Sequence, residues 1–136
     1  MGASFKDDHA LETYKSMITV SIEAFKLMAL LNGGAAAGII AAYDKVSAAV
    51  DPGSLKLSIC LFVLGLVCVG GAFVCSYLTQ NVLFNELMGF KEPDSHMPIL
   101  KFGMGCVVFS LAFFSAGALV AGFNIHEVQP CARMPR

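Results

Sequence analysis

Hydrophobic residues in this chain are gathered into three long runs that are separated by short polar segments. The runs cover residues 25–43, 55–78 and 99–125. Each is about as long as the ~20 residues of helix that cross the hydrocarbon core of a bilayer. The sequence therefore predicts an all-α integral membrane protein, a single domain over residues 1–136 with three transmembrane helices.

Two segments rich in turn-forming residues separate the runs. The first is DPGS at residues 51–54, which predicts a break and then a helix with Ser54 as its N-cap. The second is KEPDSHMP at residues 91–98, which places Pro98 in the first turn of the third helix, where proline is well tolerated. Residues 126–136 follow the last run and are expected to form a polar tail.

The first and second helices are predicted to continue beyond the bilayer on one side. Apolar residues recur every three or four positions across residues 11–24, which is typical of an amphipathic helix. A helix from residue 11 to residue 43 would be ~50 Å long, against a hydrocarbon core of ~30 Å. The apolar face of the second run likewise continues to residue 88. Because both extensions fall on the same side, we expect them to form a helical collar that serves as a docking surface.

The overall composition supports a membrane location. Hydrophobic residues make up 57% of the chain and charged residues 14%, whereas a soluble domain carries about a quarter charged residues. A chain of this length has too small an interior to bury the excess. The net charge of -1 provides no basic surface for nucleic acid. The lipid bilayer and other membrane proteins are therefore the expected partners.

Small residues recur at four-residue intervals in each run and predict faces for close helix packing. In lipid, apolar burial does not drive helices together, so small residues that admit close backbone contact matter more. Asn32 lies about one turn before such a face and is expected to donate a hydrogen bond to a neighbouring helix. The alternative is that Asn32, Gly33 and Gly34 form a kink or an unwound turn that lines a cavity. The residues assigned to packing are Asn32, Gly33, Gly34, Gly38, Ala42, Gly71, Gly117, Ala118 and Gly122.

Few residues within the three runs have charged or catalytic side chains. Glu23 and Lys26 are three residues apart at the mouth of the first span and are expected to pair near the headgroups. No histidine falls in the middle of a run, so no haem site is expected, and no nucleophile with an adjacent base or phosphate-binding loop can be identified. The near-absence of charge at depth argues against an ion-coupled transporter. We therefore expect a non-enzymatic protein without a cofactor.

These features favour a structural or accessory subunit that assembles with itself or with a larger membrane complex through its small-residue faces. The alternative is a homo-oligomeric pore or membrane-disrupting protein, holin-like or an effector channel, since Asn, Ser, Thr and backbone groups can line a pore. The cytoplasmic membrane of a bacterium is the expected location. Five of the nine Lys and Arg residues fall on the side of the N-terminus, a small bias that favours a cytoplasmic N-terminus.

Overall fold

The protein is a bundle of three long helices and one short helix, seen in a computed structural model that describes residues 2–124, with side chains from residue 8. The elements are α1 (Gly2–Ala41), α2 (Tyr43–Val46), α3 (Pro52–Leu87) and α4 (Met97–Phe123). The described residues contain no extended strand, and three of the helices are long and apolar enough to cross a membrane. The chain is therefore an all-α membrane protein with three spans, as the sequence predicts.

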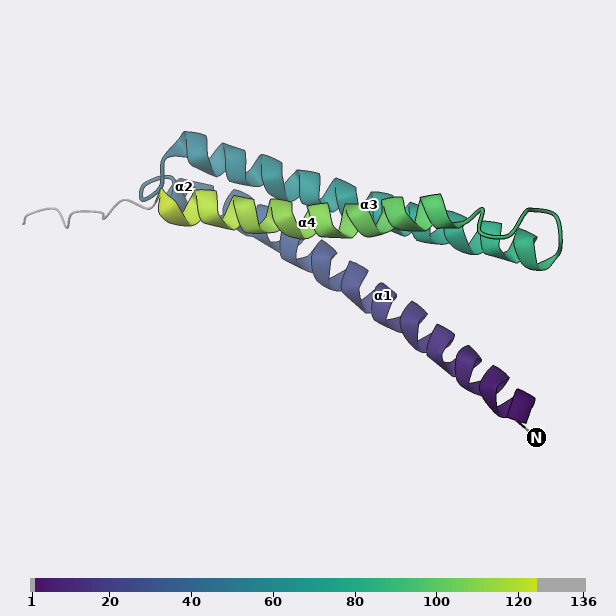
Figure 1. Ribbon diagram of the computed structural model, residues 1–136. Coiled ribbons are helices and arrows are strands. Elements are labelled where there is room, and N and C mark those ends of the chain that lie inside the picture. The colour runs from purple at the N-terminus through teal and green to yellow at the C-terminus, as the bar shows by residue number, and fades with distance from the viewer. Residues whose placement is uncertain (1, 125–136) are drawn as a thin grey trace, which may run out of the picture.

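Helices α3 and α4 lie side by side and run in opposite directions (Figure 1). Helix α1 packs against this pair through its C-terminal half and diverges from it toward its N-terminus. Residue 2 and residue 124 consequently lie at opposite ends of the bundle. This is the arrangement expected for an odd number of spans.

The start of α1 differs from the prediction. The amphipathic pattern placed the first residue of the helix at residue 11, but α1 begins at Gly2 and is continuous to Ala41. The prediction of the start was wrong because it relied on apolar periodicity alone. The segment GASFKDDHA contains no proline, so nothing in it prevents the helix from continuing toward the N-terminus.

The two ends of α3 are set by local capping. Asp51, and not Ser54, is the N-cap: its carboxylate accepts a hydrogen bond from the Ser54 N–H at 2.9 Å, and Pro52 occupies the first turn. At the other end Gly89 has a φ of 77°. The N–H groups of Gly89 and Phe90 bond to the carbonyls of Glu86 and Asn85, which is the Schellman pattern. Pro98 lies in the first turn of α4, as predicted.

The buried faces of α3 and α4 carry a seven-residue repeat of small side chains. On α3 the buried small residues fall at every seventh position, and α4 repeats the pattern with its own three buried residues; they are Ser58, Gly65, Ala72 and Thr79 on α3, and Gly103, Ser110 and Gly117 on α4. A seven-residue spacing keeps one face of a helix toward a nearly antiparallel neighbour. Small residues on that face let the two backbones approach closely.

The N-terminal part of α1 diverges from α3 and α4. Side chains from residue 8 to residue 23 are exposed, apart from the half-buried Ile18. The extensions of α1 and α3 lie at the same end of the bundle, but α1 diverges from the α3–α4 pair there (Figure 1). The predicted extensions are both helical, but they diverge and do not pack together as a collar.

Candidate assembly site

Asn32 lies where the three long helices meet. Its side chain is fully buried, and Nδ2 donates to the Ser110 hydroxyl of α4 at 3.1 Å and to the Met28 carbonyl of its own helix at 3.1 Å. The bond to Ser110 joins residues 78 positions apart in the chain. The predicted hydrogen bond from Asn32 across a helix interface is present. An interhelical bond of this kind contributes on the order of 1 kcal/mol in a membrane.

Gly65 of α3 provides the space that the Asn32 side chain occupies. A Cβ atom built on Gly65 would overlap the Oδ1, Cγ and Nδ2 atoms of Asn32. Asn32 Oδ1 is buried without a hydrogen-bond donor among the described residues. It lies at the position that a Cβ of Gly65 would occupy. Asn32, Gly65 and Ser110 thus form one polar junction, with a residue from each helix.

Three other predicted packing glycines face a neighbouring helix. A Cβ on Gly117 would lie 2.8 Å from the Phe62 ring, so the ring of α3 sits directly on the α4 backbone. A Cβ on Gly33 would lie 3.6 Å from Leu66, and one on Gly71 would lie 3.6 Å from the Cys106 sulfur. These glycines lie at contacts within the chain.

Most of the remaining predicted packing residues have no close neighbour among the described residues. A Cβ on Gly34, Gly38 or Gly122 would meet nothing within 4 Å. Ala118 is exposed, and Ala42 is half-buried where α1 gives way to α2. The spacing of Gly34, Gly38 and Ala42 still places them on one side of the chain, so their packing role remains a prediction for contact with another molecule. We refer to Gly34 and Gly38 as the open face of α1.

The predicted Glu23–Lys26 pair is formed on the surface of α1. The Lys26 ammonium lies 2.8 Å from the Glu23 carboxylate, and both side chains are about two-thirds exposed. A solvated pair at this spacing contributes ~0.3–0.5 kcal/mol. It therefore has only a small effect on the stability of the fold.

A second polar contact, which the sequence did not indicate, ties α3 to the start of α4. The Glu86 carboxylate accepts the His96 backbone N–H at 2.8 Å, and Nδ1 of His96 lies 3.0 Å from the second carboxylate oxygen. The two residues are ten positions apart across a turn, so no helical spacing links them. This contact fixes the direction in which α4 leaves the turn.

The described residues contain no group of three or more His, Cys, Asp or Glu side chains that could hold a metal ion. Cys60, Cys68, Cys75 and Cys106 are free thiols. Comparison of the chain with protein-family models, with curated proteins and with solved structures gives no match. The Asn32 junction and the open face of α1 are therefore the features on which a functional argument rests.

Proposed function

We propose that this protein is a non-enzymatic membrane subunit that assembles through the open face of α1, either with further copies of itself or within a larger membrane complex. The observation that carries the proposal is the division of the glycines of α1 between two environments. Gly33 lies against α3, whereas Gly34 and Gly38 face open space. Glycine weakens a helix by ~1 kcal/mol relative to alanine. In the single chain, no close helix contact compensates for this loss at Gly34 and Gly38.

The energetics of helix packing in lipid support the same reading. Two helices associate in a membrane through close backbone contact and not through removal of apolar surface from water. The junction at Asn32 holds the opposite face of this part of α1 to the bundle. The open face is consequently presented to the bilayer on a helix of fixed orientation, which lowers the entropy lost when a partner binds.

The alternative, a pore lined by the segment around Asn32, has less support. A pore-lining residue faces the axis between copies, whereas Asn32 is fully buried within one chain. Ser58 and Ser110 are also fully buried and directed into the bundle, although Ser115 of α4 is exposed. A pore would have to be lined by other residues.

The test is the mass of the protein–detergent complex for wild type and for Gly34→Leu and Gly38→Leu variants. Neither substitution meets an atom of the same chain at Cβ, so the fold should persist while a partner helix is forced away. We expect wild type to behave as an oligomer or to co-purify with other subunits, and both variants to lose these partners. Far-ultraviolet circular dichroism should give the same helical content for all three proteins.

Ile40→Leu is the matched control, because Ile40 is also exposed on α1 but lies on a different side of the helix. It should retain the wild-type mass. A monomeric wild type without co-purifying protein, or variants that keep the wild-type assembly, would contradict the proposal. Ion flux measured on the same samples in vesicles separates a subunit, which should be silent, from a pore.

A further inference from the structure

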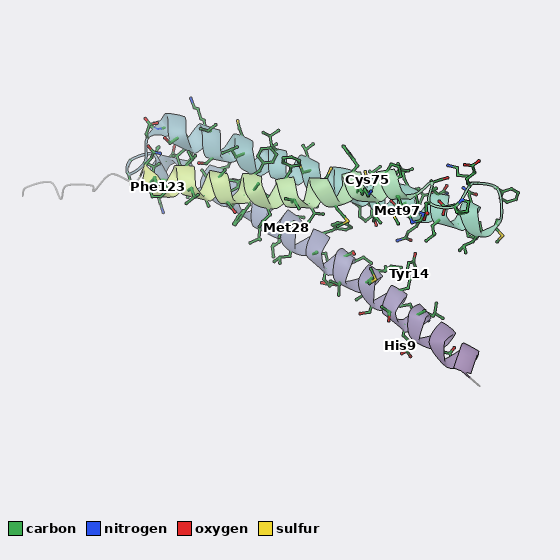
Figure 2. The ribbon with its side chains drawn as sticks, viewed as in Figure 1. His9, Tyr14, Met28, Cys75, Met97 and Phe123 are labelled. Atoms are coloured by element: carbon green, nitrogen blue, oxygen red, sulfur yellow. The ribbon has the colours of Figure 1, made fainter. Side chains whose placement is uncertain are left out.

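Where α1 diverges from the α3–α4 pair, the molecule has an open groove. The groove begins beside Phe25 and Phe73, whose rings contact edge to face with centroids 6.4 Å apart. From there it widens toward the N-terminus of α1, with a volume of about 670 Å³. In Figure 2, Tyr14 lies on the projecting part of α1, across from Cys75 and Met97 on the pair. A volume of this size falls within the range of small-molecule sites, ~300–1,000 Å³.

The lining of the groove changes from apolar to polar along its length. Its narrow end is formed by Phe25 of α1, Ala72 of α3 and Val108 of α4, all without a polar side-chain atom. Its wide end is formed by Tyr14 of α1, Gln80 of α3 and His96, the residue that precedes α4. This order follows the bilayer, because the narrow end belongs to the apolar runs and the wide end to the segments that extend beyond them.

Charge and size restrict what the groove can hold. None of its described lining residues is Asp, Glu, Lys or Arg, so a charged group would lie in the apolar part without a counter-charge. An α-helix of 10–12 Å diameter fills ~120–170 Å³ per residue. The groove therefore holds the volume of about one helical turn, so the transmembrane helix of a partner would lie largely outside it. A hydrocarbon tail is thinner and uncharged.

We propose that the groove binds one acyl chain of a membrane glycerolipid, with the tail toward Phe25 and Phe73 and the polar part of the lipid at Tyr14, Gln80 and His96. The ester carbonyls of such a lipid are hydrogen-bond acceptors located where the tail joins the headgroup. Tyr14 and Gln80 are exposed at the wide end of the groove and carry donors for these acceptors. This proposal concerns a different surface from the open face of α1 and does not depend on assembly.

The absence of tryptophan from the chain permits a direct test. Met104→Trp places the only tryptophan on the groove wall, and Phe102→Trp places it on the same helix outside the groove. Each variant is reconstituted into phosphatidylcholine vesicles with brominated acyl chains, extracted into lipid-free detergent and freed of unbound lipid. Bromine quenches tryptophan fluorescence on contact, so quenching that survives extraction reports a retained chain.

We expect Met104→Trp to remain quenched at least twofold after extraction, relative to the same variant from vesicles without bromine. Phe102→Trp should recover fully. Adding Ser21→Phe, on the α1 wall of the groove, should abolish the retained quenching. Adding Thr19→Phe, on α1 but outside the groove, should leave it unchanged. Full recovery of both tryptophans, equal residual quenching of both, or insensitivity to Ser21→Phe would overturn the proposal.

Discussion

At the scale of single residues, the polar junction depends on three roles. Asn32 donates a hydrogen bond, Ser110 accepts it, and Gly65 has no side chain and so leaves room for the Asn32 amide. The sequence indicates Asn32, because an amide in an apolar run needs a partner, and it predicts that Asn32 donates to a neighbouring helix. It does not indicate Gly65 and Ser110 in the same way, because small-residue packing is expected at four-residue spacing whereas these residues follow a seven-residue spacing. Whether a given glycine faces a neighbour depends on where the neighbouring helix lies, which spacing on one helix does not define.

Gly65→Ala tests the junction most closely. The added methyl overlaps the Asn32 amide, and overpacking of this kind costs about 1–3 kcal/mol of unfolding free energy. In the double variant Asn32→Ala, Gly65→Ala the overlap is removed. We therefore expect the two changes together to cost at least ~1 kcal/mol less than the sum of the single changes. Reversible unfolding in mixed micelles, followed by circular dichroism, provides the free energies.

Gly70→Ala is the control for this prediction, because a Cβ at Gly70 meets nothing within 4 Å. It should be neutral or stabilising by up to ~1 kcal/mol, as expected for replacement of glycine in a helix. If Gly65→Ala is as well tolerated as Gly70→Ala, Asn32 does not occupy the space beside Gly65.

At the scale of elements, the three spans and most of their ends could be predicted, because apolar runs and turn-forming segments are local signals. The position of α1 relative to α3 and α4 could not be predicted, because periodicity identifies which face of a helix is buried but not which helix covers it. For example, Phe109 and Phe123 of α4 are exposed, whereas Phe62 of α3 packs its ring against Gly117 of α4.

The part of α1 that diverges from α3 and α4 should behave as an independent helix. Proline at Thr19 removes a backbone hydrogen bond and costs ~3 kcal/mol of local helix. Since residues around Thr19 are exposed and the Asn32 junction lies more than three turns away, we expect faster amide hydrogen exchange in residues 8–22 only. Exchange in α3 and α4 should be unchanged. Faster exchange throughout the bundle would indicate that this part of α1 packs against it.

At the scale of the whole molecule, the ends of the described chain lie at opposite ends of a three-span bundle (Figure 1). In the membrane this predicts termini on opposite sides. Single cysteines introduced at Ser4 and Arg136, in a variant whose native cysteines are replaced by alanine, should react with an impermeant thiol reagent from different sides of sealed vesicles. Reaction of both from the same side would contradict a three-span topology.

The central claim is that the open face of α1 meets another protein in the membrane, and position-specific crosslinking there tests it most directly. A thiol-linked photocrosslinker is attached to Gly38→Cys or to Ile40→Cys in the same alanine-substituted background and activated in native membranes. We predict that residue 38 yields discrete protein adducts, either a dimer of this chain or a fixed set of partner masses, and that residue 40 yields lipid adducts alone. Lipid adducts alone at both positions, or the same protein adducts at both, would contradict the account.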